Sequence, residues 1–251
     1  MKAVLLGSIG VLCDSSDLQR QAYNAAFEEA GLQWHWDKPL YQTLLLVPGG
    51  AERVRDYAEK QGMDAVPDIA MIHERKAQIY AQMLDTQKQT LRHGVLRLIR
   101  EAKTQGVKVG WVTSTDYSNL VAIMDRSEGQ LTSSDFDVIT HRGNVENAKP
   151  DPAPYRSALA TLGIKSEEAI AIEDTGVCVN SATGAGLMCV ATPHEYSLGH
   201  DFSQATSVVD SLGEPDMPAS SLSGARILNE QGMVTVKALK QLIDSVEASG
   251  G

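Results

Sequence analysis

Three groups of polar residues follow apolar stretches of the sequence, and together they could bind a phosphate group and a metal ion. Thr113 and Ser114 end the run VKVGWV and bring hydroxyls and backbone N–H groups to the start of a predicted helix, which is a typical anion site. Lys149, in a turn stiffened by two prolines, can reach a phosphate as a compact point charge. Glu173 and Asp174 follow AIAI and offer the hard oxygen ligands that suit Mg²⁺.

Each of these signals also has a simpler interpretation. Hydroxyl groups before a helix are typical of ordinary helix capping, and a single loop lysine is usually solvated. Two carboxylates at the end of a strand can cap the next helix or pair with Lys149. Each signal is therefore weak alone, and its weight depends on whether the fold brings the three groups together.

The second half of the chain alternates between predicted helices and strands. GVLRLIREAKTQG, YSNLVAIMDR, APYRSALATLG and CVNSATGAG have helical patterns, and VKVGWVTST, FDVIT, AIAIEDT and MCVAT have strand patterns. Because parallel strands need crossover connections, this alternation predicts an α/β fold, a Rossmann-like doubly wound parallel sheet with helices on both faces. Ligands of such sheets bind beyond the carboxyl ends of the strands, here residues 7–10, 113–115, 147–150 and 173–175.

A helical segment separates the first predicted strand, residues 3–6, from this alternation. Its apolar residues are spaced as in helices throughout, and this pattern is interrupted only at prolines and glycines. Ser16 and Gln19 predict a capping box at its start, with Gly31 ending the first helix. We expect a small all-helical cap of residues 16–89 inserted after the first strand of a core formed by residues 1–15 and 90–251.

Composition narrows the class of protein. The chain has 251 residues, 43% of them hydrophobic and 22% charged, and a net charge of −10, which argues against nucleic acid as a partner. The apolar opening is not a secretion signal, because Val11 and Leu12 are too bulky for a cleavage site, and no stretch is long enough to span a membrane. We expect a cytoplasmic protein with Cys13, Cys178 and Cys189 as reduced thiols.

Taken together and in this order, the strand ends resemble the second, third and fourth motifs of the haloacid dehalogenase superfamily. Several stretches resemble one branch of this superfamily, the CbbY-type sugar-phosphate phosphatases, which are relatives of β-phosphoglucomutase. These stretches are QAYNAAFEEAGLQWHWD, GGAERVRDY, LRHGVLRLIREAKTQGVKVGWVTST, AKPDPAPY, IEDTGVCVNSATGAG and SLGHDFSQATSVVDSLGEPD. The resemblance covers the chain up to about residue 216. It implies a Mg²⁺-dependent phosphohydrolase with an aspartyl-phosphate intermediate, a helical cap, and substrates such as xylulose 1,5-bisphosphate. It also implies Thr113, Ser114 and Lys149 as phosphate ligands and Glu173 and Asp174 as metal ligands.

The first motif of that family is incomplete in this chain. The family pattern is Asp, any residue, Asp, Gly, Thr or Val, Leu, and aligning it with GSIGVL places Gly7 at the nucleophile and Ile9 at the general acid/base. The chemistry needs the first carboxylate to attack phosphorus and ligate Mg²⁺, and the second to protonate the leaving oxygen. Residues 7 and 9 share one face of a strand and Ser8 lies on the other, so no neighbour replaces them. Asp14 lies further along the chain.

These gaps change what we expect of the metal and of the cap. Mg²⁺ binding is weak at best with only Glu173 and Asp174 left, and Lys149 is free to pair with one of them. Gln19 and Ala51 stand where the family commonly has His and Lys. The cap keeps several residues at positions that can contact a second phosphate or position the cap over the core. These residues are Gly49, Gly50, Arg53 and Lys76.

Three hypotheses remain open. The first is a catalytically inactive relative that binds a small phosphorylated metabolite, an anion or a protein partner, as a monomer and without a membrane. The second is an enzyme with residual or altered Mg²⁺-dependent hydrolysis of a small phosphorylated sugar through Glu173, Asp174 or a bound water. The third is a purely structural or partner-binding protein.

Overall fold

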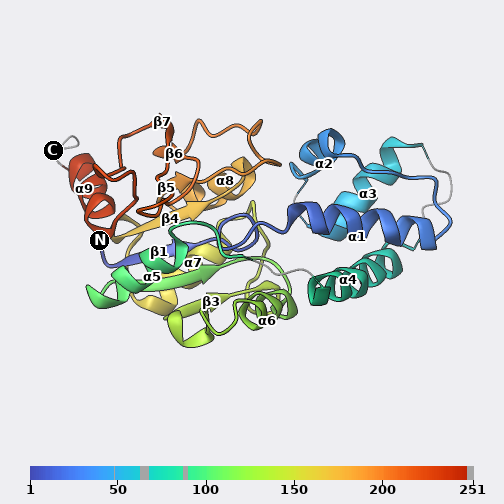
Figure 1. The fold of residues 1–251 in the computed structure, drawn as a ribbon, viewed down its shortest axis with the longest axis horizontal. Coiled ribbons are helices and arrows are strands. Elements are labelled where there is room, and N and C mark those ends of the chain that lie inside the picture. Colours follow the sequence, from blue (N-terminus) through green and yellow to red (C-terminus); the bar gives the residue numbers. More distant parts are fainter. Residues whose placement is uncertain (48, 63–67, 87–89, 248–251) are drawn as a thin grey trace.

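The computed structural model of the chain describes residues 1–47, 49–62, 68–86 and 90–247. A sheet with helices packed on it forms one part of the molecule, and a group of helices lies beside the sheet's carboxyl end (Figure 1). The N-terminus lies at the opposite end of the sheet. This arrangement leaves the carboxyl ends of the strands facing the separate group of helices.

The sheet has the order β3-β2-β1-β4-β5-β6-β7 and is parallel except for its last pair. Its strands are β1 (Ala3–Leu6), β2 (Lys108–Val112), β3 (Val138–Thr140), β4 (Ala169–Glu173), β5 (Met188–Ala191), β6 (Ser207–Val209) and β7 (Ser221–Gly224). Every residue of β1 and β4 is buried, as expected of apolar central strands covered on both faces. The predicted parallel α/β core is confirmed. The sequence did not predict β6 or the antiparallel edge strand β7.

Helices cover both faces of the sheet. Val4 and Leu6 of β1 pack with α5 (Val95–Thr104), α6 (Tyr117–Arg126) and α9 (Val236–Glu247). Ala3 and Leu5, which point the other way along the strand, pack with α7 (Ala153–Leu162) and α8 (Gly176–Gly184). The doubly wound arrangement is confirmed, because alternate residues of a single strand supply the two cores.

The insert consists of the helices α1 (Ser16–Glu29), α2 (Lys38–Leu44), α3 (Gly50–Lys60) and α4 (Ile69–Thr86), with no strand among its described residues. Buried aromatic rings hold these helices together. Trp36 lies 4.7 Å from both Tyr23 and Phe27, centroid to centroid, and Tyr196 from the loop after β5 joins the cluster against Tyr41. We call α1 to α4 and their connections the cap. The division at residues 15/16 and 89/90 stays a prediction.

The predicted capping box at the start of α1 is wrong. Ser15 is the N-cap residue and its side chain caps no N–H group; the Ser16 N–H instead donates to Asp14 Oδ1 at 3.0 Å. The Gln19 carboxamide accepts a hydrogen bond from Lys76 of α4. The Gln19 side chain therefore bonds to Lys76 of another helix and does not cap the start of its own helix.

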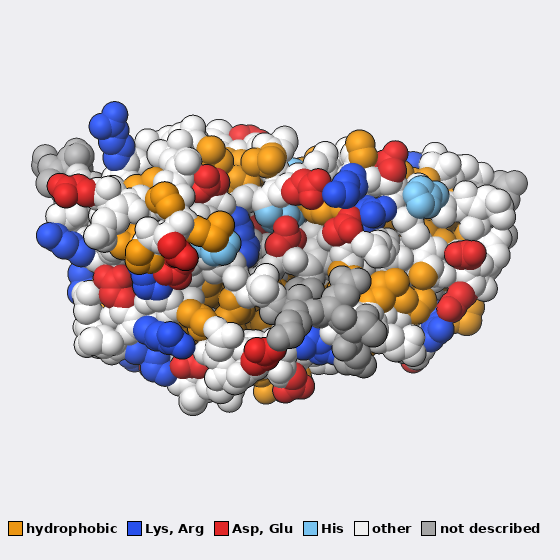
Figure 2. Space-filling model, in the orientation of Figure 1, with side chains coloured by type: hydrophobic (Ala, Val, Ile, Leu, Met, Phe, Trp, Pro, Cys, Tyr) orange, Lys and Arg blue, Asp and Glu red, His pale blue; other side chains and the backbone are white. Residues whose placement is uncertain are grey.

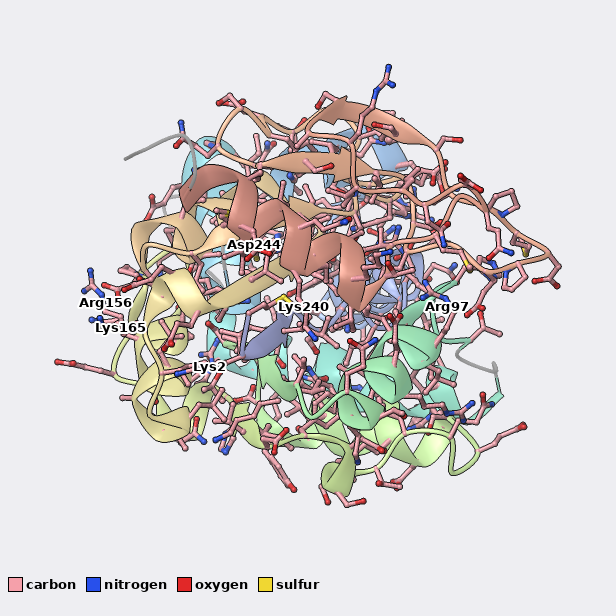
Figure 3. All side chains as sticks on the ribbon, turned by 90° about the vertical axis from the view of Figure 1, so that its left-hand side faces the viewer. Lys2, Arg97, Arg156, Lys165, Lys240 and Asp244 are labelled. Atoms are coloured by element: carbon pink, nitrogen blue, oxygen red, sulfur yellow. The ribbon has the colours of Figure 1, made fainter. Side chains whose placement is uncertain are left out.

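The end of the core remote from the cap carries the basic residues labelled in Figure 3, with Arg156 and Lys165 at its edge and Lys240 nearer the middle. Three of them form ion pairs with acidic neighbours: Lys2 with Glu168 at 2.6 Å, Lys165 with Glu167 at 3.6 Å, and Arg97 with Glu101 at 3.5 Å and with Glu214 at 3.8 Å. Acidic and basic side chains are also interspersed on the face shown in Figure 2. No described helix is both long enough and apolar enough to cross a bilayer.

Candidate functional site

A cavity of about 240 Å³ lies between the carboxyl ends of the strands and the cap. It gathers the sequence-predicted site residues from both parts of the chain. Its lining includes Ile9, Gly49, Gly50, Arg53, Lys76, Thr113, Ser114, Lys149, Glu173 and Asp174. The fold therefore brings the three polar groups together as the strand ends predicted. The binding roles of these residues stay predictions.

The loop between β2 and α6 supplies hydroxyls and backbone N–H groups to the cavity. Part of this polar set serves the loop itself: the Thr113 N–H donates to Thr140 Oγ1 at 3.2 Å, and Ser114 Oγ accepts from the Lys149 N–H at 2.9 Å. Asp116, the N-cap residue of α6, makes no side-chain capping bond. Among the described residues the Ser114 N–H has no partner. This loop keeps free donors at a helix start, as an anion site requires.

Lys149 and Glu173 form a buried ion pair, which was one of the two pairings the sequence allowed. The Lys149 Nζ donates to Glu173 Oε1 and to the Val112 carbonyl at 2.8 Å, and Tyr155 donates its hydroxyl to the same carboxylate oxygen. Burial alone would lower the pKa of Lys149, but the Glu173 carboxylate raises it. Burial raises the pKa of Glu173, against the opposing effect of Lys149. Sequence reasoning did not assign Tyr155.

His194 joins two carboxylates at the edge of the cavity. Its Nε2 lies 3.2 Å from Asp174 Oδ2 and its Nδ1 lies 3.4 Å from Asp14 Oδ2. Burial would lower the pKa of His194, but the hydrogen bonds to Asp14 and Asp174 raise it to about 9. Sequence reasoning missed this residue because it considered only four strand ends. The end of β5 at Ala191, three residues earlier, was the available signal.

The backbone of the first loop lies directly against the two acidic side chains. A Cβ atom at Gly7 would overlap Glu173 Oε2, and a Cβ atom at Gly10, whose φ is 89°, would overlap the Asp174 carboxylate. Ile9 lines the cavity and packs partly against the main hydrophobic core. The sequence supplies no carboxylate at residues 7 to 9, and Glu173 lies beside the space that a side chain at residue 7 would fill.

In the cap, Arg53 is largely used to hold the local structure. Its Nε donates to the Leu44 carbonyl at 2.9 Å, its Nη2 donates to the Val47 carbonyl at 3.2 Å, and its guanidinium lies 5.5 Å from the centre of the Tyr41 ring. Gly50 allows a close approach, because a Cβ atom there would lie 2.5 Å from His73 Nε2. Both residues therefore shape the wall of the cavity.

Lys76 is a buried cation facing the same cavity. Its Nζ donates to Gln19 Oε1 and lies 4.6 Å and 5.1 Å from the ring centres of Tyr23 and Tyr80. Burial lowers the pKa of Lys76 to about 7. Aromatic faces and one amide oxygen stabilise this ammonium group, and no ion pair with a carboxylate is found for it among the described residues.

The donor set at the strand ends does not fit Mg²⁺. Within the described ranges, the one cluster of three possible metal donors is Glu173, Asp174 and Cys178. Mg²⁺ prefers six hard oxygen ligands in a nearly octahedral array, and Cys178 offers soft sulfur whose pKa is raised by burial. Glu173 already receives Lys149 and Tyr155, and Asp174 faces His194. These three residues therefore do not form a site suited to Mg²⁺.

Comparison with known proteins identifies the family of the chain and agrees with its fold. The model of the haloacid dehalogenase-like hydrolases matches residues 10–192, so the chain belongs to that family. The match begins just after the two altered positions of the first motif.

Two CbbY proteins are similar over most of their length. CbbY of Cupriavidus necator, plasmid-encoded, is 36% identical over 224 residues, 87% of this chain and 88% of that protein. A solved variant of CbbY from Rhodobacter sphaeroides in complex with xylulose 1,5-bisphosphate has 34% identity and a TM-score of 0.79, and the match covers 86% and 96% of the two chains. β-Phosphoglucomutase from Clostridium difficile shares the fold, with a TM-score of 0.75 at 17% identity over 99% of each chain.

Proposed function

We propose that this chain is a non-hydrolysing member of its family that binds a small phosphorylated sugar. One observation carries the proposal: Gly7 and Ile9 leave the end of β1 without a nucleophile and without a proton donor, and Glu173 lies against Gly7. Glycine and isoleucine can neither attack phosphorus nor carry a proton. His194 and Asp14 do not restore the first motif, because they pair with each other beside Asp174.

The retained donors support binding. Lys149 and the residue 113–115 loop present charge and N–H groups at one wall of the cavity, and Lys76 presents a buried ammonium group at the other. Two groups of positive character across a cavity suit an anionic ligand with more than one polar end. The structures of CbbY in complex with xylulose 1,5-bisphosphate and with phosphate support a ligand of this class for the present chain.

Two measurements with xylulose 1,5-bisphosphate test the proposal. We expect the sugar bisphosphate to raise the melting temperature of the protein, with no phosphate release in the presence of Mg²⁺. Ser114→Ala should weaken the thermal shift, whereas Ser134→Ala, at an exposed serine outside the cavity, should leave it unchanged. Phosphate release that depends on Mg²⁺ and disappears in Asp174→Ala would show that the chain is a hydrolase and that the proposal is wrong.

Residual hydrolysis is the second candidate function. Glu173 and Asp174 remain adjacent at the cavity, as a Mg²⁺-dependent phosphatase would need. The release assay separates the two candidates, because a binding protein shows the thermal shift alone and a phosphatase shows both signals.

A further inference from the structure

We propose that phosphate binding at this cavity needs no divalent cation, because Lys149 and His194 occupy the carboxylates that would hold one, and that the Ser8 hydroxyl is an additional phosphate ligand. The inference rests on the proposed function, since it concerns the same cavity. It goes further by assigning two residues, Ser8 and His194, to the site.

One oxygen of the Glu173 carboxylate is already bonded to two donors. Its Oε1 accepts hydrogen bonds from Lys149 and Tyr155, and its Oε2 lies beside the backbone at Gly7. The carboxyl and both donors are buried, with at most 7% of each residue exposed. A buried carboxylate paired in this way loses a charge-assisted bond if a metal displaces the lysine, and an ammonium group left unpaired there is costly.

The Asp174 carboxylate is held in a similar way by His194. Both the backbone and the ring of His194 are held: its backbone N–H donates to Ser197 Oγ at 3.0 Å, its Nε2 lies 3.2 Å from Asp174 Oδ2, and its Nδ1 lies 3.4 Å from Asp14 Oδ2. The backbone at Gly10 also lies close to this carboxylate, because a Cβ atom there would overlap Asp174 Oδ2. The ring therefore has little freedom to leave the oxygen that a metal would need.

Ser8 provides a donor that no described residue uses. Its hydroxyl is buried, with 6% of the residue exposed, and it has no hydrogen-bond partner among the described residues. Ser8 also lines the cavity beside the residue 113–115 loop and Lys149. Buried hydroxyls rarely stay unpaired, because desolvation without a compensating bond is unfavourable. A phosphate oxygen would satisfy the Ser8 hydroxyl, with Lys149 supplying the charge.

Calorimetric titration with inorganic phosphate tests the metal requirement. We expect the dissociation constant in excess EDTA to lie within about twofold of that in Mg²⁺. Mn²⁺ titrated alone and followed by its electron paramagnetic resonance signal should show no saturable binding. Phosphate binding that requires Mg²⁺, or saturable Mn²⁺ binding by the wild-type chain, would overturn the inference and leave the proposed function standing. Phosphate binding in neither buffer would instead overturn the proposed function.

Two substitutions assign the residues. Ser8→Ala should weaken phosphate binding about fivefold to tenfold, as expected for one lost hydrogen bond, without lowering the melting temperature. Ser134→Ala is the matched control and should change neither quantity. His194→Asn, which removes the ring from Asp174, should produce measurable Mn²⁺ binding. Unchanged phosphate affinity in Ser8→Ala would refute the role of Ser8, and continued absence of Mn²⁺ binding in His194→Asn would refute the role of His194.

Discussion

Replacing Lys149 by methionine removes one ammonium group from the buried pair with Glu173 and changes the side-chain volume little. Glu173, of which 1% is exposed, then keeps Tyr155 as its hydrogen-bond donor. A buried carboxylate without its ion-pair partner either stays charged at a cost of about 3–5 kcal/mol or takes up a proton. The free energy of unfolding therefore depends on the pH at which it is measured.

The cost of protonation sets the magnitude. Removing Lys149 raises the folded-state pKa of Glu173 further above its ordinary value of 4.5. At pH 7 a carboxyl that must be neutral in the folded state costs roughly 3.4 kcal/mol, and at pH 5 about 0.7 kcal/mol. These costs are upper limits for the loss relative to the wild type, in which the pKa of Glu173 is already raised. The variant should be nearly as stable as the wild type below about pH 4.5. Its stability falls as the pH rises, because the folded variant binds a proton that the unfolded chain releases.

Urea unfolding of the wild type and the variant at pH 5 and pH 7 measures the effect. We expect Lys149→Met to lose about 3 kcal/mol at pH 7 and less than about 1 kcal/mol at pH 5. The double variant with Glu173→Gln should recover much of the loss. Lys165→Met removes a lysine from an exposed pair, with 78% of that side chain exposed, and should change stability by less than about 0.5 kcal/mol. An equal loss at both pH values would refute the reasoning, since a packing defect does not titrate.

Three further predictions use the same unfolding assay. Gly10→Ala should lower the free energy of unfolding by about 3 kcal/mol, and Gly31→Ala should lower it by about 1 kcal/mol. Both glycines have positive φ, but only a Cβ atom at Gly10 also overlaps Asp174. Equal losses in the two variants would contradict this reasoning. Tyr196→Ala should cost about 3 kcal/mol by removing a buried ring that joins the core to the cap aromatic cluster, and a loss under about 1 kcal/mol would show that the contact is unimportant. Burial would lower the pKa of His194, but its hydrogen bonds raise it to about 9, so the stability of the wild type relative to His194→Asn should fall by up to about 3 kcal/mol from pH 6.5 to 9. The comparison uses the difference between the two proteins because burial lowers the pKa of Lys76 to about 7, which raises the stability of both as the pH rises. A difference that does not change with pH would argue against this residue.

The core of the fold could be predicted because its strands are apolar runs separated by helices of crossover length. Residues 169–173 illustrate this, since AIAIE is buried along its whole length between β1 and β5. The edge strands could not be predicted in the same way. Residues 221–224 of β7 are all exposed, and pairing with β6 makes them a strand without any hydrophobic pattern.

The same distinction separates the predicted and the missed parts of the site. Thr113, Lys149 and Glu173 could be found because the ends of parallel strands meet at one edge of a sheet, whatever the loops do. His194 and Ser8 depend on loop geometry. His194 reaches Asp174 from the turn after β5, where its backbone N–H donates to Ser197 Oγ, and Ser8 lies buried at the cavity in the loop between β1 and α1. A local pattern of residue types does not predict the position of either side chain.

Charge balance explains how this edge of the sheet can lose two aspartates and still fold. The family pattern implies two carboxylates at residues 7 and 9 together with Mg²⁺, and removing two negative charges and one divalent cation leaves the net charge unchanged. Lys149 then still balances Glu173, and His194 stands between Asp174 and Asp14. Losing the carboxylates alone would leave a divalent cation with too few ligands, and losing the cation alone would leave four carboxylates facing each other. We therefore expect the carboxylates of the first motif and the metal requirement to be absent together, which connects the proposed lack of hydrolysis with the proposed metal-independent anion site.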